Sequence, residues 1–160
     1  MIEETTINAA VDYLESREEE FELLVEDFGQ AQPALLAYVL SESTDVLTNH
    51  EKEYLLFLAL TVWKSFELEG LGKIIQEVEP EVIEEKEDVF WGWISESKER
   101  DFNKKIDRFF EESEEEELFA FLEDALEMEE NEWLTPHGRE AIFVFMATLI
   151  EVLSEAVKKG

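Results

Sequence analysis

The segments Tyr54-Leu-Leu-Phe-Leu-Ala-Leu-Thr-Val-Trp63 and Ala141-Ile-Phe-Val-Phe-Met-Ala-Thr-Leu-Ile150 are the strongly apolar runs in an otherwise very acidic chain. Each run contains a single polar residue, a threonine at the eighth place, which is Thr61 in the first and Thr148 in the second. A helix that is apolar on every side must lie inside the protein. The two runs therefore predict the centre of the fold.

Both runs follow residues that typically begin a helix. Thr48 and Glu51 form a Thr-x-x-Glu capping box before the first run, and Thr135 is followed by Pro136 before the second. Periodicity alone does not separate a short buried strand from a buried helix. The caps, and the amphipathic continuation of both runs, favour helix over strand.

The rest of the chain shows helical spacing of apolar residues, with prolines and glycines near the expected helix ends. With 160 residues and 45% hydrophobic composition, the chain is long enough for one domain with a real core. We predict a single all-α domain, residues 1–160, of about seven helices in a compact bundle. The expected helices cover residues 5–28 with a break at Arg17-Glu18, 33–40, 48–69, 80–97, 102–110, 113–126 (opened by a second capping box, Ser113 with Glu116) and 135–158.

The two central segments align with each other at an offset of 87 residues, which places His50 opposite His137. Over fifteen aligned positions, five residues are identical, and they include both histidines of the chain. We interpret this as an internal duplication, with units at about 5–69 and 80–158 and a connector at 70–79. Two units are few for an open solenoid, so a closed pseudo-symmetric bundle is expected.

The charge balance restricts the kind of partner. The chain has 42 acidic and 13 basic residues, which gives a formal net charge of −29. Such a chain repels phosphate backbones and anionic lipid, and it attracts basic protein surfaces and cations. We therefore expect neither a nucleic-acid partner nor a membrane partner. High-salt proteomes also produce acidic proteins, and the sequence does not distinguish that origin.

Several catalytic and targeting motifs are missing from the sequence. There is no cysteine, which removes disulfides, a thiol nucleophile and thiolate metal sites. The N-terminal residues do not resemble a secretory signal, and the apolar runs are shorter than the ~20 residues of a membrane-spanning helix. There is no nucleophile elbow or phosphate-binding glycine loop. We expect a cytoplasmic protein without a cofactor and without enzymatic activity.

The most site-like pattern is a His-x-x-Glu pair in each repeat, His50 with Glu53 and His137 with Glu140. This spacing places both side chains of a pair on one helix face, and two pairs related by a pseudo-dyad could bind Zn²⁺ or Fe²⁺. Di-iron helices carry the opposite order, Glu-x-x-His. First-turn residues copied by duplication account for the pattern more simply, so these four residues are weak candidates for a metal site.

The threonines inside the apolar runs need a hydrogen-bond partner if they are buried. A helical threonine hydroxyl can bond to the carbonyl four residues earlier. We therefore predict bonds from Thr61 to Phe57 and from Thr148 to Val144, which is a structural rather than a ligand-binding role.

Two features are candidates for an interaction surface. Trp91 lies off the apolar stripe of its helix, beside Glu84 and Glu87, so it is either a core residue or an exposed anchor surrounded by acid. Trp133, before the last helix, is better explained by packing. A dense acidic run could dock a cationic partner, although a solvated face at a favourable helix N-terminus is the stronger interpretation. Its candidate interaction residues are Glu114, Glu115, Glu116 and Glu117.

These observations favour a non-enzymatic acidic interaction module that binds a basic protein partner or self-associates. The first alternative is an inhibitor of the immunity-protein type, or a nucleic-acid mimic, with carboxylates at phosphate-like spacing. The second alternative is a metal-binding helical protein that uses the His-x-x-Glu pairs.

Overall fold

The computed structural model describes residues 1–159, with the side chains of all of these except Glu42, Lys158 and Lys159. Every regular element in this part of the chain is helical, which confirms the predicted all-α class. Its α-helices and 3-10 helices (η) are, in chain order, α1 Glu4–Glu15, η1 Glu18–Glu20, α2 Phe21–Ala31, α3 Pro33–Val39, η2 Glu42–Val46, α4 Asn49–Leu68, α5 Pro80–Glu96, α6 Phe102–Lys105, α7 Asp107–Glu112, α8 Glu116–Ala125 and α9 Pro136–Lys159.

The structure has more α-helices than the seven predicted, because two of the predicted helices are interrupted. The first predicted helix is broken where the sequence indicates, because η1 separates α1 from α2. Residues 102–110 form two short helices, α6 and α7, instead of one. The other predicted helices are each present. The proposed duplication is an interpretation of the sequence, and the arrangement of helices does not by itself establish it.

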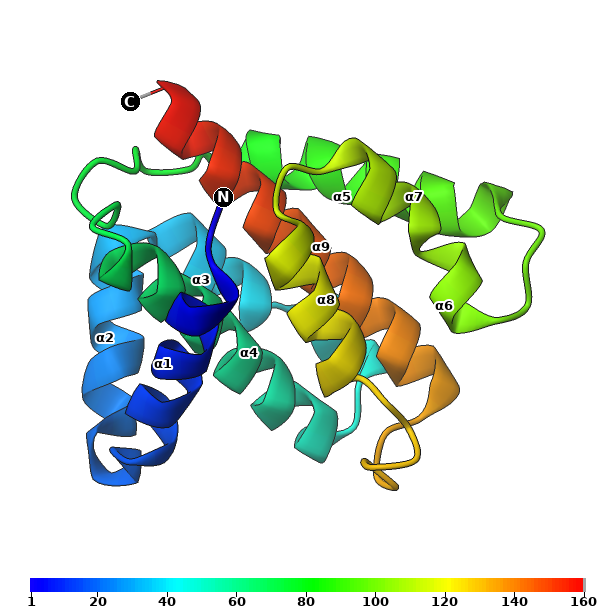
Figure 1. Ribbon diagram of the computed structural model, residues 1–160, viewed down its shortest axis with the longest axis horizontal. Helices are drawn as coiled ribbons and strands as arrows, with labels where there is room; N and C mark the ends of the chain where they lie inside the picture. Colours follow the sequence, from blue (N-terminus) through cyan, green and yellow to red (C-terminus); the bar gives the residue numbers. More distant parts are fainter. Residues whose placement is uncertain (160) are drawn as a thin grey trace.

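Helix α9 lies at the centre of the molecule (Figure 1). It packs along α5 and also contacts α4 and α8. All residues of its apolar run, Ala141–Ile150, are buried. The run in α4 is buried from residue 58 to residue 63, whereas Tyr54, Leu56 and Phe57 are half-buried. The prediction of a fully enclosed apolar run therefore holds for α9, while the start of α4 reaches the surface.

The two threonines of the central helices are satisfied within their own helix. The hydroxyls of Thr61 and Thr148 donate to the carbonyls of Phe57 and Val144, each at 2.8 Å. Both threonines are completely buried. The predicted structural role is confirmed for both.

Helix α4 ends in a glycine-dependent Schellman motif. Gly70 has φ +80°, a conformation that costs little only for glycine. The Gly70 N–H donates to the Glu67 carbonyl at 2.9 Å, and the Leu71 N–H donates to the Phe66 carbonyl at 3.0 Å. The chain then turns into the non-helical segment that leads to α5.

The capping box predicted for Ser113 with Glu116 is wrong. Helix α8 begins at Glu116, and Glu115 occupies the cap position without a side-chain cap. The Ser113 hydroxyl instead accepts a hydrogen bond from the Glu115 N–H at 2.9 Å and donates to the carboxylate of Glu151 on α9. The hydroxyl therefore forms its hydrogen bond with a residue of a distant helix, and no local sequence pattern could indicate this partner.

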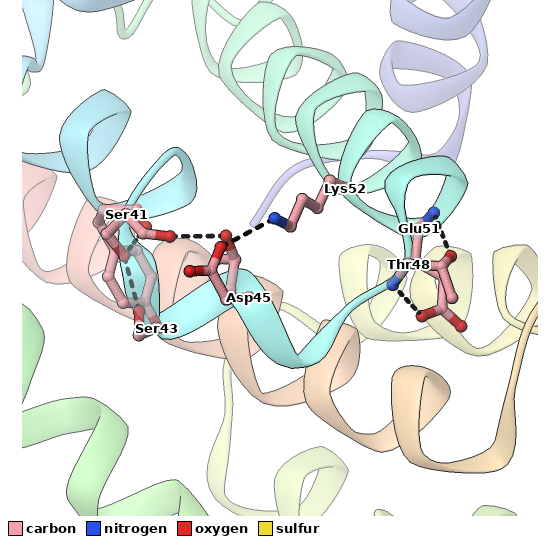
Figure 2. A network of polar contacts seen from close by, with 8 residues as sticks. Ser41, Ser43, Asp45, Thr48, Glu51 and Lys52 are labelled. Atoms are coloured by element: carbon pink, nitrogen blue, oxygen red, sulfur yellow. Dashed lines mark hydrogen bonds and ion pairs between the residues drawn. The ribbon is translucent and has the colours of Figure 1, made fainter.

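A single buried carboxylate, that of Glu51, caps both central helices. Its Oε1 accepts the Thr48 N–H at 2.9 Å, while the Glu51 N–H donates to the Thr48 hydroxyl at 3.1 Å, which completes the predicted capping box (Figure 2). Its Oε2 accepts both the N–H and the hydroxyl of Thr135, at 2.8 and 2.9 Å. The Thr135 hydroxyl in turn accepts the Gly138 N–H at 2.9 Å, so it caps α9. Glu51 is 0% exposed, and it links the first turns of α4 and α9.

Gly138 provides the space for this carboxylate. In the proposed repeat, Gly138 is the counterpart of Glu51, so the second unit lacks the glutamate of the capping box. A Cβ atom at position 138 would lie 2.1 Å from Glu51 Oε2. The glycine at position 138 is therefore required by the carboxylate of Glu51, which occupies the space that a side chain at position 138 would need.

None of the helices in residues 1–159 combines the length and the apolar character that a membrane crossing requires.

We predict strong coupling between Glu51 and Gly138. E51A should lower the free energy of unfolding by about 2–4 kcal/mol, because the part-buried donors at two helix N-termini lose the buried acceptor that they share. G138A should destabilise the wild-type protein through the Cβ clash. In the E51A background the clash is gone, and G138A should become neutral or stabilising by up to about 1 kcal/mol through helix propensity. Urea unfolding of the wild type, E51A, G138A and the double variant E51A/G138A measures this double-mutant cycle. E53A, which changes an exposed glutamate, is the control. Additive effects would contradict the shared cap.

The Glu51 carboxylate also predicts a pH dependence. Burial alone would raise the pKa of Glu51, but the hydrogen bonds from Thr135 and Thr48 outweigh it and hold the pKa below its ordinary value. Its contribution to stability is therefore present above the unfolded-state pKa of about 4.3 and is lost as the pH falls through the lower folded-state value. The stability difference between wild type and E51Q should shrink as the pH falls below about 4. Urea unfolding between pH 3 and 7 measures it, and a constant difference would be the contrary result.

Candidate functional site

A cavity of about 370 Å³ lies between α3, the segment that follows it, and the first half of α5. The volume falls within the range of about 300–1,000 Å³ that is usual for ligand pockets. Its lining residues are Ala34, Ala37, Tyr38, Ser41, Ser43, Pro80, Ile83, Glu84 and Glu87. We call this hollow the α3–α5 cavity.

The local sequence explains why the helices leave this space. Pro33 and Pro80 occupy the first turns of α3 and α5, where the fixed φ of proline favours the start of a helix. Ala34 and Ala37 line the cavity with side chains no larger than a methyl group, so α3 does not fill the gap towards α5. Ile83 is buried beneath the cavity and forms its apolar floor.

Tyr38 is the polar centre of the cavity. Its hydroxyl donates to Glu87 Oε1 at 2.5 Å, which joins α3 to α5. Burial, and then the hydrogen bond and the negative charge of Glu87, raise the pKa of Tyr38, while the Thr148 hydroxyl acts in the opposite direction. The phenol therefore stays protonated and acts as a donor. The ring of Tyr38 packs edge-on against Phe145 of α9, with the ring centroids 5.9 Å apart.

Two acidic residues belong to the described lining of the cavity. Glu84 is exposed and Glu87 is half-buried, and none of the lining residues that the structure describes is a lysine or an arginine. Apolar walls beneath a carboxylate rim suit a side chain that carries a positive charge at the end of an aliphatic stem. Lysine and arginine have this shape, and Ser41 and Ser43 add polar groups to the lining.

Trp91 lies close to this cavity but does not line it. It is half-buried, and its ring packs edge-on against Phe145 with the centroids 6.3 Å apart. Tyr38 and Trp91 thus contact the same phenylalanine. Of the two interpretations that the sequence left open, this packing favours a core contact over a fully exposed anchor.

The acidic run before α8 is not uniformly exposed. Glu115 is only 4% exposed, and its carboxylate accepts the Ile2 N–H at 2.8 Å. Glu114 and Glu116 are exposed, and Glu117 is half-buried. The expectation that Glu115 belongs to an exposed acidic surface is therefore wrong, because this carboxylate is an internal acceptor for the N-terminal segment.

The structure places the two histidines in the exposed first turns of α4 and α9. His50 stacks on Trp133, with the ring centroids 3.9 Å apart. Glu53 is exposed, and Glu140 forms an ion pair with Lys105 at 3.1 Å. Within residues 1–159, no three His, Asp or Glu side chains are grouped so that they could hold a metal ion.

Trp133 is held by aromatic packing, as predicted. In addition to His50, it contacts the edge of Tyr54, with the centroids 4.9 Å apart. The Tyr54 hydroxyl donates to the Ala125 carbonyl at 2.7 Å. These contacts fasten the segment between α8 and α9 to the first turns of α4.

Comparison with protein-family models, with curated proteins and with solved structures gives no match for this chain.

In the sequence, Glu84 and Glu87 stand out only as neighbours of Trp91, and no pattern singles out Tyr38. Tyr38 lies off the apolar stripe of its helix, which in hindsight is the signal that it contacts something other than the core. The identity of its partner depends on how α3 packs against α5. No spacing within either helix contains that information.

We predict that the Tyr38–Glu87 hydrogen bond stabilises the fold. Y38F should lower the free energy of unfolding by about 1–2 kcal/mol, because a half-buried carboxylate loses its donor. E84Q removes a carboxylate at the same cavity that is exposed, and it should change stability by less than about 0.5 kcal/mol. Chemical unfolding of both variants measures the contrast. Equal effects of Y38F and E84Q would contradict the assigned role of Tyr38.

Proposed function

We propose that this protein is a non-enzymatic interaction module that binds a basic segment of a protein partner, with a lysine or arginine side chain of the partner inserted into the α3–α5 cavity. The observation that carries the proposal is the chemistry of the cavity, whose described lining combines an apolar floor with the carboxylates of Glu84 and Glu87. The net charge of −29 supports it, because the whole molecule attracts a cationic partner.

The surface next to the cavity also suits a protein partner. Leu40 and Val46 flank the segment that contains Ser41 and Ser43, and they are 59% and 57% exposed. Exposed apolar side chains beside a pocket can pack against the stem of an inserted residue and its neighbours. The long-range charge would accelerate the encounter, whereas the cavity would select the bound side chain.

The test uses a fluorescent lysine-containing peptide with apolar residues on both sides of the lysine. E84Q/E87Q removes two charges at the cavity, and E22Q/E26Q removes two charges from exposed positions of α2. We expect the cavity variant to weaken binding at least fivefold relative to the α2 control, as measured by fluorescence anisotropy. Glutamine in place of the lysine should also reduce binding.

Two results would contradict the proposal. Equal weakening by the two charge-matched variants would show that only the overall charge attracts the peptide. Binding that disappears completely between low salt and about 0.15 M ionic strength would show a screened surface attraction without an inserted side chain.

A further inference from the structure

A second cavity, of about 200 Å³, lies on another side of α5, where α5 faces α7, α8 and α9. Four aromatic residues line it, namely Phe90, Trp93, Phe109 and Phe119. The rings contact one another, since Phe109 lies 5.0 Å from both Phe90 and Trp93 by their centroids. We call it the aromatic cavity. It shares no lining residue with the α3–α5 cavity.

Three carboxylates also line this cavity. They belong to Glu112, Glu151 and Glu155, and among the lining residues that the structure describes, Lys86 is the one that is basic. Glu151 is half-buried and accepts the hydroxyl hydrogen of Ser113. Burial, together with Glu155 and Glu115, raises the pKa of Glu151, although Ser113 and Lys86 act in the opposite direction. The charge of Glu151 is therefore incompletely balanced by the surrounding groups.

The protein already places a cation in this cavity. The Lys86 ammonium lies 2.7 Å from Glu155 Oε1 and 6.0 Å from the centre of the Phe90 ring. The Arg108 guanidinium is not among the lining residues of the cavity, but it also lies over one of its rings, 4.3 Å from the centre of Trp93. Both arrangements bring positive charge to the face or rim of an aromatic ring, where its quadrupole attracts cations.

We infer that the aromatic cavity binds a small alkylammonium group, held beside the rings of Phe90 and Trp93 that line the cavity and by the carboxylates of Glu151 and Glu155. The volume is below the range of about 300–1,000 Å³ for drug-sized ligands, which limits the occupant to a small cation. Aromatic rings combined with carboxylates are the chemistry that recognises methylated ammonium groups. Lys86 competes for the same carboxylate, so it limits the affinity of the external ligand.

Choline is the probe, and 3,3-dimethyl-1-butanol, which has nearly the same shape without the charge, is its control. Binding is followed by Trp93-dependent fluorescence and by NMR shifts of the cavity residues, with sodium chloride added to equal ionic strength. We expect saturable choline binding at about millimolar concentration, and binding of the neutral compound at least fivefold weaker. Equal binding of both compounds would overturn the inference, because the cavity would then recognise only an apolar shape.

Four variants locate the site. E151Q and W93L should each weaken choline binding about fivefold, whereas K86M should strengthen it about fivefold by removing the internal competitor. E22Q, on the exposed surface of α2, should leave it unchanged. Circular dichroism shows whether each variant is folded. If W93L does not fold, E151Q provides the test. Unchanged affinity in E151Q and K86M would overturn the site.

The alkylammonium group could belong to a free small molecule or to a lysine side chain, and a second ligand distinguishes them. N-acetyl-trimethyllysine methylamide carries the same head group as choline on a peptide-like stem. Tighter binding of this compound at the same residues supports a side chain as the source, and tighter binding of choline supports a free cation. The inference does not rest on the proposed function, since E84Q/E87Q should leave choline binding unchanged.

Discussion

The carboxylate of Glu51 is the interaction on which the arrangement of the two central helices depends. The first N–H groups of a helix lack partners within the helix, and they lie at the positive end of its dipole. One buried carboxylate serves this end of both α4 and α9, through Thr48 and Thr135. Because its two oxygen atoms bond to two different helices, it holds their first turns at a defined separation. Gly138 makes this approach possible, since any larger residue would occupy the same space.

Helix α9 supports a residue of the α3–α5 cavity from behind and lines the aromatic cavity directly. Phe145 of α9 supports the rings of Tyr38 and Trp91, and Tyr38 bonds to α5 beside the α3–α5 cavity. One to three turns further along α9, Glu151 and Glu155 reach the aromatic cavity, where Glu155 pairs with Lys86 of α5. Helix α5 therefore contributes to both proposed cation-binding cavities, and its packing against α9 holds it in place between them.

The acidic composition has two physical roles in this molecule. Most glutamates face the solvent, where they produce a negative field around the protein. Glu51 and Glu115 are instead buried acceptors of backbone N–H groups, at the start of the central helices and at Ile2. Glu123 is intermediate, because partial burial, together with Asp124 and other neighbouring carboxylates, raises its pKa. The same residue type thus organises the interior and charges the surface.

The sequence by itself determined the helical class, the central position of the apolar runs, the caps at Thr48 and Thr135, and the internal bonds of Thr61 and Thr148. All of these depend on residues within one or two helical turns, whose contacts follow from helix geometry. Only the tertiary structure decided that Glu51 caps a second helix, that Glu115 is buried, that Ser113 bonds to Glu151 and that Tyr38 meets Glu87. Each of these contacts joins residues that are distant in the chain, and this includes Glu115, whose carboxylate accepts the Ile2 N–H. Their geometry depends on how whole helices pack, and periodicity along one helix identifies its buried face without identifying the helix that covers it.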